Sequence, residues 1–583
     1  MQGLTRRWVF RDPAATAELD RMPLPKRILH ARGLRDPDVL RQFCEPKLTD
    51  LYDPELMPGL EMAATRLVAA VRRGESIAIY GDYDVDGITA SAIVYHTVKA
   101  VAPESDIRIY IPHRIDEGYG LNSDALRHLH AGGVDLVISV DCGITAIEPA
   151  RVARSIGLDL IITDHHNLPA SDGAIPEAMA VVHPRLPGSQ YPFGELCGAG
   201  IAFKLAWGFA TIWSGSRRVG SSLQQLLLNL LPLAALGTIA DMVPLVDENR
   251  TIATFGLRWI RQTPLVGLRA LIEEANLMDA DIDSEKVGFI LAPRLNACGR
   301  MGHAAEAVDM LTAASPSKAR AIAGRLTALN RERQQTERSI VEHAALLATD
   351  AGMTKDDRRA IVLAHESWHT GVLGVACTRL CERFSRPVVL LKRQGDLCKG
   401  SARSIKEYSI YDALRACSGC LQSFGGHDAA AGLSLATTDF PAFVEALIAH
   451  ANAHLSPRQL TPTAYIDCNA TIDELDFDSV RQIGALAPFG RDNPRPTLRL
   501  PDATLADSPR TVGAQGRHLI MNLRSGEPAR RRWLRSVWFN AGALAATLVP
   551  GMQLEVLIEP KINTYKGRTS IEAELRDVKL PDQ

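Results

Sequence analysis

The sequence lacks the features that would direct a chain into a membrane, out of the cell or, by charge alone, onto a nucleic acid. Its 583 residues contain no apolar run of 18 or more residues, and the charged start, MQGLTRRWVFRDP, does not resemble a signal peptide. The ten cysteines are scattered, and the one C-x-x-C, at Cys417 and Cys420, has no second pair, which disfavours a disulfide framework and a zinc site. Because the formal net charge is -2, any polyanion must be held by a local basic patch. We therefore expect a cytoplasmic chain with no membrane contact.

Alternating apolar and amphipathic segments are the first positive feature of the chain. Hydrophobic residues make up 46% of it and charged residues 23%, as in globular proteins, and its length predicts three or four domains. We predict parallel β-strands at 76–80, 107–112, 136–141, 160–164 and 180–184. Short apolar strands separated by helices are typical of a parallel sheet covered on both faces, and such sheets bind ligands at the carboxyl ends of their strands.

The remainder of the chain predicts helices, a second sheet and a barrel. In chain order we predict helices at 198–213 and 223–243, a long polar helix at 316–350, and a second α/β unit with strands at 360–364 and 387–392 around a helix at 371–384. After about residue 463, short alternating strands with frequent Gly and Pro indicate a small β-barrel.

The stretch YGDYDVDGITA (80–90) follows the first predicted strand and carries three alternating aspartates, Asp82, Asp84 and Asp86. An EF-hand loop also begins D-x-D-x-D-G, but its twelfth position, a calcium-binding Glu, is Ile93 here. A phosphoaspartyl phosphatase of the haloacid-dehalogenase type would use Asp84 as nucleophile, but the Thr of that motif comes one place too late, at Thr89. A third possibility is that a divalent cation neutralises carboxylates that would otherwise repel one another. The stretch alone does not decide among the three.

Further polar residues are predicted at the same sheet edge. Asp141 ends the third predicted strand, Asp164, His165 and His166 end the fourth, and Asp241 ends a long apolar helix. Carboxylates with imidazole and without thiolate favour Mn²⁺ or Mg²⁺, and they are too many for one ion that also binds water and substrate. We expect two ions, roughly 3.5–4 Å apart, and hydrolysis of a phosphodiester or phosphoanhydride. Singly, each Asp is more often a helix N-cap and His165 a packed histidine, so the metal site depends on their predicted co-location.

Four motifs in this part of the chain resemble, in order, the phosphoesterase motifs of the DHH superfamily: GDYDVDG, VDCGITA, TDHHNLP and GTIADMVPL. Later segments are similar to motifs of the single-strand-specific DNA exonucleases in that superfamily. They are APRLNACGRM (292–301), WHTGVLG (368–374), GSARS (400–404), FGGHDAAAG (424–432) and LAPFGRDNPRP (486–496), the last resembling the opening of an oligonucleotide-binding barrel. The resemblance covers most of the chain. It implies a metal-dependent exonuclease that degrades single-stranded DNA 5′ to 3′ to mononucleotides in DNA repair and recombination.

The resemblance also implies a role for each motif residue. The metal ligands would be Asp84, Asp86, Asp141, His165 and Asp241. Asp141 would bridge two Mn²⁺ or Mg²⁺ ions, Asp86 and Asp141 would take part in catalysis, and a metal-bound hydroxide would be the nucleophile. Asp82 would bind a metal ion either directly or through another ligand. These two roles stay open because related phosphatases have a His ligand four residues before Asp84, and this chain has Tyr80 there. His166 would face the scissile phosphate as a positioning group or acid.

Substrate-binding residues are implied outside these motifs. Arg300 matches a phosphate-binding arginine of the family, although an interdomain salt bridge would also explain it. Ser401, Arg403 and His427 lie among small residues, where backbone amides can approach phosphate oxygens and an Arg can hold them with two hydrogen bonds. In the predicted barrel, interleaved arginines and aromatics between 517 and 539 are typical of non-specific single-strand binders. The candidate contacts are Arg530, Arg531, Arg532 and Trp533, with barrel core as the alternative for the aromatic.

We therefore predict an α/β chain with a parallel-sheet phosphoesterase lobe, a long connecting helix, a second α/β lobe and a C-terminal β-barrel of OB type. The expected domains are an N-terminal segment packed on the catalytic lobe (1–70), a catalytic domain (71–315), a connecting helix (316–352), a substrate-binding domain (353–460) and an OB-fold domain (461–583). A single strand would pass between the two α/β lobes, which would exclude duplex sterically. Family resemblance implies a helicase and a single-strand-binding protein as partners.

Two other functions stay open at this point. A small-substrate phosphodiesterase or pyrophosphatase of the same superfamily would need only the first two domains, so the predicted barrel disfavours it. A non-catalytic DNA-binding scaffold of a replication complex would not need intact acidic and histidine positions in all four motifs.

Overall fold

The protein folds into two compact units, each described by itself below. The structure is a computed structural model that describes residues 1–13, 21–113, 117–118, 120–169, 174–312, 315–525, 532–565 and 567–581. The motif unit comprises Arg41–Gln334 and Ala487–Pro494. The barrel unit comprises Met1–Leu40, Gln335–Leu486 and Arg495–Gln583.

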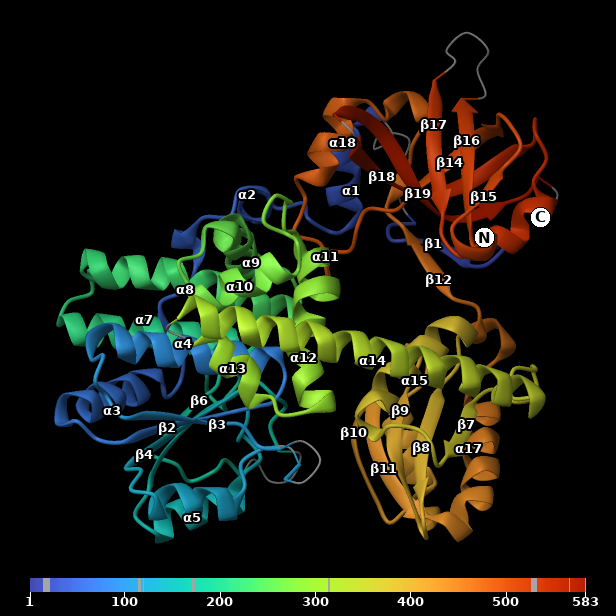
Figure 1. Cartoon of the computed structure of the whole chain (residues 1–583). Coiled ribbons are helices and arrows are strands. Elements are labelled where there is room, and N and C mark those ends of the chain that lie inside the picture. Colours follow the sequence, from blue (N-terminus) through green and yellow to red (C-terminus); the bar gives the residue numbers. More distant parts are fainter. Residues whose placement is uncertain are drawn as a thin grey trace. The chain divides into compact units, whose positions relative to one another are not determined.

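The motif unit is built on a parallel five-stranded sheet with the order β3-β2-β4-β5-β6 (Figure 1). Its strands are β2 (Ile77–Gly81), β3 (Ile107–Tyr110), β4 (Leu136–Val140), β5 (Asp159–Thr163) and β6 (Ala180–Val182). All five predicted strands are present, and β2 and β4 are buried along their whole length. The strand order reverses between β2 and β4, because the chain pairs β3 on one side of β2 and β4 on the other. Sheets of this kind bind ligands at the carboxyl ends of the strands beside such a reversal.

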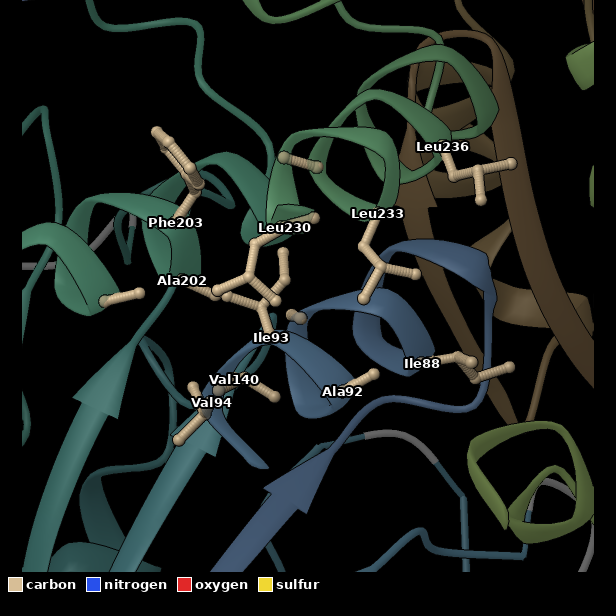
Figure 2. Close-up of a cluster of buried hydrophobic side chains, with 14 of the residues drawn as sticks. Ile88, Ala92, Ile93, Val94, Val140, Ala202, Phe203, Leu230, Leu233 and Leu236 are labelled. Carbon is tan, nitrogen blue, oxygen red and sulfur yellow. The ribbon is translucent and has the colours of Figure 1, made fainter. Parts of the chain in front are cut away.

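Helix α4 (Val85–Val101) follows β2 and lies between the sheet and two further helices, α7 (Gly198–Ser214) and α8 (Ser221–Ala240). Figure 2 shows Ile93 of α4 beside Ala202 of α7 and Leu230 of α8. Because α4 is apolar on nearly every side, it is a core helix and its N-terminus is held rigidly beside the sheet edge. The opposite face of the sheet is covered by α5 (Ser123–Ala131) and α6 (Ile147–Ser155).

Helix α8 has the length and composition of a membrane-spanning segment, alone among the helices of the described residues. Most of its side chains are nevertheless buried inside the motif unit, where it packs against α4, α7 and α9 (Asp247–Trp259). Burial within the protein core accounts for its apolar sequence.

The N-terminal segment up to Leu40 belongs to the barrel unit, whereas Arg41 onward belongs to the motif unit. Strand β1 (Arg7–Phe10) pairs in parallel with β12 (Thr463–Ile466). The buried carboxylate of Asp577 accepts hydrogen bonds of 2.8–3.0 Å from the Thr5 backbone and hydroxyl, the Arg6 backbone and Trp8 Nε1. Pairing partners this distant in sequence leave no local pattern in residues 1–40.

The rest of the barrel unit contains a second sheet and a closed barrel. The sheet has the order β10-β11-β9-β8-β7, and α15 (Thr370–Phe384) packs on β8 and β9. Its strands are β7 (Ile361–His365), β8 (Val388–Gln394), β9 (Leu397–Arg403), β10 (Ser423–His427) and β11 (Ala430–Ala436). The long helix α14 (Pro316–Asp350) matches the predicted polar helix and divides at Gln334 between the two units.

The C-terminal strands close into the predicted barrel of OB type (Figure 1). The closed ring runs β14-β18-β19-β17-β16 and back to β14, through a β14–β16 pairing. The strands are β14 (Leu498–Leu505), β16 (His518–Ser525), β17 (Trp533–Trp538), β18 (Gln553–Tyr565) and β19 (Arg568–Lys579). Five strands in this order are the OB-fold arrangement.

One segment inside the expected OB domain belongs instead to the motif unit. Within Ala487–Pro494, the carbonyl oxygens of Ala487, Phe489 and Arg491 accept hydrogen bonds from Arg250, Ser284 and the Leu245 backbone. The segment thus lies within the predicted range 461–583 in sequence but makes its contacts in the motif unit. Its Pro- and Gly-rich sequence indicates a loop but not which unit the loop contacts.

A buried ion pair fixes α7 to α9 and supplies the first prediction. Lys204 on α7 and Glu248 on α9 are both fully buried, and Glu248 also accepts hydrogen bonds from Tyr191 and the Tyr52 backbone. Lys204→Met leaves an uncompensated buried carboxylate and should lower the free energy of unfolding by about 3–5 kcal/mol in chemical denaturation. Arg127→Met, which removes an exposed partner of Asp124, should leave the midpoint unchanged. An equal midpoint for wild type and Lys204→Met would contradict this role.

Candidate metal centre and binding surfaces

The aspartates of the first motif lie at the N-terminus of α4. Asp84 is the N-cap, and its Oδ1 accepts hydrogen bonds from the backbone N–H groups of Asp86 (2.9 Å) and Gly87 (3.2 Å). Asp86 is 1% exposed, and its two oxygens accept from the backbone N–H groups of Gly198 (2.6 Å) and Ala199 (2.8 Å) at the start of α7. Two helix N-termini therefore stabilise these carboxylates electrostatically. The capping role and a metal-binding role do not exclude each other, because Asp84 Oδ2 takes no part in the cap.

Asp141 follows β4 directly and is held in a strained conformation. Its φ is 62°, in the left-handed region that is uncommon for residues other than glycine. A Cβ at Gly198 would lie 2.5 Å from Asp141 Cβ, so the start of α7 can approach only with glycine at this position. Strain of this kind persists where the surrounding structure determines the conformation, and it is concentrated at functional sites.

The structure brings the predicted acidic and imidazole residues together at the carboxyl edge of the sheet. Their ligand atoms form three overlapping groups, each within 4.8 Å, and the groups are Asp82–Asp84–Asp141, Asp86–His165–Asp241 and Asp141–His165–His166. Asp141 and His165 each belong to two groups, so the first two groups are adjacent. The distances from His165 Nε2 are 3.1 Å to Asp141, 3.7 Å to Asp86 and 3.7 Å to Asp241.

The two histidines differ because of their neighbours. Burial lowers the pKa of His165 to about 4, so its ring is neutral at neutral pH, the form that binds a metal ion. Burial alone would also lower the pKa of His166, but its 2.7 Å hydrogen bond to Asp164 and the charge of Asp164 raise it to about 9. Burial would raise the pKa of Asp164, but hydrogen bonds from His166 and from the Ile144 backbone lower it to about 2. His166 therefore carries a proton at neutral pH.

The carboxylates are strongly perturbed in the opposite direction. Burial and the charge of Asp86 raise the pKa of Asp241 to about 9, and burial with the neighbouring aspartates raises the pKa of Asp141 well above its usual range. The pKa of Asp84 is also raised, by burial and by Asp86. Several buried carboxylates at one place are unfavourable unless protons or cations neutralise them.

These residues fit a pair of hard cations. Asp141 Oδ1 and His165 Nε2 are buried, face each other at 3.1 Å and have no hydrogen-bond partner among the described residues. Such orphaned buried atoms are expected where an ion is bound. The first group offers three carboxylates, and the adjacent second group offers two carboxylates and an imidazole. Neither group contains a thiolate, and this ligand set suits Mn²⁺ or Mg²⁺. Asp82 lies with Asp84 and Asp141, which places it in the first of these groups.

A second surface lies on the sheet of the barrel unit. Ser401 and Arg403 of β9 are paired with Gly432 and Ala430 of β11, which are paired in turn with Gly425 and His427 of β10. Directly paired residues share one face of an antiparallel sheet, so Ser401, Arg403 and His427 lie on the same face. A Cβ at Gly374 in α15 would lie 3.0 Å from the Arg403 guanidinium and 3.6 Å from Ser401 Oγ. This face therefore combines polar side chains, a helix N-terminal region and small residues that leave room for a ligand.

Arg300 lies in the motif unit, in the last turn of α12 (Ala292–Met301). The residue before it, Gly299, packs so closely that a Cβ there would come 2.8 Å from the carbonyl oxygen of Tyr83. Arg300 is thus carried by a helix that contacts the acidic loop.

A third surface is the outward face of β16 and β17 in the barrel. Trp533 is 58% exposed and pairs with Arg524, while Arg535 pairs with Asn522. Trp538 is buried in the barrel, so the core alternative holds for Trp538 and not for Trp533. Arg532 is exposed and donates to the Asp473 carbonyl, whereas Arg530 and Arg531 lie outside the described residues. The strands that correspond to β16 and β17 form the usual ligand-binding face of OB folds.

Several functional groups were not identified from the sequence. Asp164 orients His166, and the Gly198 and Ala199 amides hold Asp86. The position of Asp164 immediately before two histidines could have indicated the first role. The amide contacts join residues more than a hundred positions apart and leave no local signal.

Comparisons with known proteins agree with this arrangement. Three family models match the chain, namely the DHH family N-terminal domain at 76–238, the DHHA1 domain at 357–453 and the RecJ OB domain at 466–577. The single-stranded-DNA-specific exonuclease RecJ of Bacillus subtilis is 37% identical, over 99% of this chain and 71% of that protein. The Escherichia coli protein of the same name is 33% identical, over 85% of each chain. A crystal structure of RecJ with Mn²⁺ from Thermus thermophilus has a TM-score of 0.79 at 28% identity, over 99% of this chain and 79% of that one.

The raised pKa values at the centre predict how pH acts on the protein without metal. The folded-state pKa of Asp241, about 9, exceeds the value of about 3.9 expected when unfolded, so its contribution to stability is complete below about pH 4 and is lost as pH rises toward 9. In thermal unfolding with EDTA, the stability of the wild type relative to Asp241→Asn should therefore fall as pH rises from about 4 to about 9. Mn²⁺ should remove the fall, because the ions replace the protons.

The control variant is Asp124→Asn, whose side chain is exposed on α5. It should follow the wild-type curve in EDTA. A metal-free protein whose stability, relative to Asp241→Asn, rises between about pH 5 and pH 9 would contradict the assigned direction.

Proposed function

The chain belongs to the RecJ family of single-stranded-DNA-specific exonucleases, and from this premise we propose that it removes mononucleotides from the 5′ end of single-stranded DNA in repair and recombination. The proposal rests above all on the buried acidic and imidazole cluster, in which the described residues supply no hydrogen-bond partner for Asp141 Oδ1 or His165 Nε2. Its polarity and its products follow from family resemblance and are tested below.

In the proposed mechanism, Asp82, Asp84 and Asp141 would hold one Mn²⁺ or Mg²⁺ ion, and Asp86, His165 and Asp241 would hold a second. When bound, such a pair lowers the pKa of water to near neutrality and stabilises the entering and leaving oxygens of an in-line displacement at phosphorus. Asp141, which belongs to the first group and lies 3.1 Å from His165 of the second, would be the bridging carboxylate. The Gly198 and Ala199 amides keep Asp86 in place while the charge at the centre changes.

His166 supplies the proton-bearing group of this mechanism. Its Nδ1 is held at 2.7 Å by Asp164, and its Nε2 would donate a hydrogen bond to the scissile phosphate. With a pKa near 9, the ring carries its proton at neutral pH and stabilises negative charge on the phosphate oxygens.

We assign the phosphates of the substrate strand to the two other polar surfaces. Arg403 and Ser401, beside the small residues of β10, β11 and α15, suit a terminal phosphate, and His427 borders the same face. Arg300 contacts a phosphate near the centre. In the barrel, Trp533 stacks on a base while Arg532, Arg535 and Arg524 neutralise the backbone, joined by Arg530 and Arg531.

The partners and the location are also proposals. Family resemblance supports a helicase that supplies single strands, a single-strand-binding protein that covers them, and a cytoplasmic location. The burial of α8 within the motif unit agrees with the absence of membrane contact.

The rival functions are less well supported. A small-substrate phosphodiesterase has no need of a barrel with an exposed tryptophan opposite an arginine. A non-catalytic scaffold would not keep every acidic and histidine position of the four motifs converged within a few ångströms.

Digestion of single strands labelled at either end tests the reaction. With Mn²⁺, a 5′ label should appear at once as a mononucleotide, and a 3′ label should appear in a ladder of shortening products. Asp141→Asn should lower the rate more than about a hundredfold, since Asn tolerates the left-handed conformation while it removes a bridging charge. Full activity of Asp141→Asn would refute the assigned centre, and immediate release of the 3′ label would refute the polarity.

Point changes on the barrel test the single-strand surface without removing β12, the partner of β1. Trp533→Ala should raise the Kd for a long strand about tenfold, and Arg535→Ala should lower the slope of log Kd against log salt by about 0.7. Arg127→Ala on α5 is the charge control. Unchanged affinity and salt slope in both barrel variants would favour the small-substrate rival.

A further inference from the structure

A large aromatic side chain is exposed on an irregular helix in the motif unit. Phe289 lies in η5 (Val287–Leu291), a π-helical segment that leads directly into α12, and it is 69% exposed. The surface beside it is open, because a Cβ at Gly288 would meet no atom within 4 Å. Single π-helical turns are rare and are frequently found at functional sites. An exposed phenylalanine on such a turn is therefore a candidate for a binding role.

The irregular turn is stabilised by a specific contact. Arg294 Nη1 donates a 2.6 Å hydrogen bond to the Ile290 carbonyl, and its Nε donates to Thr327 Oγ1 at 3.3 Å. Because the guanidinium ties the π-helical backbone to α14, the turn that presents Phe289 is held in place. The backbone that carries the exposed ring is therefore held in one conformation.

Phe289 belongs to the same helical face as the residues beside the metal centre. Positions 289, 293, 296 and 300 recur at helical spacing; Pro293, Asn296 and Arg300 are partly exposed, whereas the intervening Leu295 and Cys298 are buried. Asn296 Oδ1 accepts a 3.2 Å hydrogen bond from the Val85 backbone, inside the aspartate loop. The face therefore passes over the acidic loop and continues outward to Phe289.

We propose that Phe289 stacks on a base of the substrate strand, a few nucleotides from the scissile linkage, and so sets the strand's path away from the metal centre. The inference rests on the proposed exonuclease function and adds a positioning residue to it. At about 1.5 Å per residue, the eleven positions from Arg300 to Phe289 span about 16 Å. A strand that rises at least about 3.4 Å per nucleotide covers this distance in about five nucleotides or fewer.

Single-stranded DNA fits this position better than an apolar partner surface. Phe289 is a single ring, and its face continues through Pro293 to the polar Asn296 and Arg300. A ring stacks on any base, which suits an enzyme that must accept every sequence. The arginine at the other end of the face provides the charge that a phosphate backbone requires.

An abasic scan tests the proposal without hydrolysis. In an Asp141→Asn background, a labelled strand carries one baseless nucleotide at successive positions from the 5′ end. We expect the affinity for the strand to fall about tenfold when the baseless nucleotide lies opposite Phe289, within about five nucleotides of the scissile linkage. Phe289→Ala should weaken binding of the intact strand by a similar factor and abolish sensitivity at that position alone, as in a double-mutant cycle. Phe289→Trp should restore both affinity and positional sensitivity.

The controls separate this inference from folding and from the reaction itself. Met62→Ala removes an apolar side chain of the same unit that is 56% exposed on α3 (Leu60–Arg73), and it should behave like the parent in the scan. A positional effect that persists in Phe289→Ala, or a scan that is flat in the parent, would overturn the proposal even if hydrolysis proceeds. If the scan locates a stacked base at Phe289 but the wild-type chain hydrolyses no DNA, the stacking role would stand and the exonuclease function would be refuted.

Discussion

The mutual repulsion of buried carboxylates is the constraint on which the rest of the structure depends. Buried Asp86 and Asp141 converge with half-buried Asp84 and Asp241, and burial with like charge raises the pKa of Asp141 and Asp241. The protein offsets only part of this cost, through amides at two helix N-termini that hold Asp86 and through the cap at Asp84. The remaining charge calls for cations. The same imbalance that makes the metal-free centre unfavourable thus gives it affinity for two hard ions and, with them, the capacity to activate water.

The sheet topology explains why these residues meet. Strand order reverses between β2 and β4, so Asp82, Asp84 and Asp86 after β2 lie beside Asp141 after β4, and β5 adds His165 and His166. The N-terminus of α7 packs against the site, and Gly198 allows its backbone to approach both Asp86 and Asp141. The buried Lys204–Glu248 pair then fixes α7 to α9. Fold stability and site geometry are therefore carried by the same helices.

The sequence predicts the repetitive parts of this architecture well. Apolar strands, the long polar helix and the closed barrel each follow from local periodicity, and the convergence of the acidic residues follows from the rule that parallel strands end at one edge. The docking of β1 beside β12, the placement of Ala487–Pro494 in the motif unit and the amide contacts to Asp86 all join residues far apart in the chain. Local patterns do not encode such pairings. The π-helical turn that exposes Phe289 is likewise not predicted by periodicity, which separates helices from strands but not π-helical from α-helical turns.

The number and spacing of bound ions test the central claim most directly. Titration of the protein with Mn²⁺, followed by electron paramagnetic resonance, should show two ions per chain whose spins are coupled, as expected for a separation of roughly 3.5–4 Å. Asp141→Asn should lose the coupling, and His166→Ala should retain it. A single uncoupled ion in the wild type, or two ions whose binding is indifferent to Asp141, would contradict a carboxylate-bridged pair at this sheet edge.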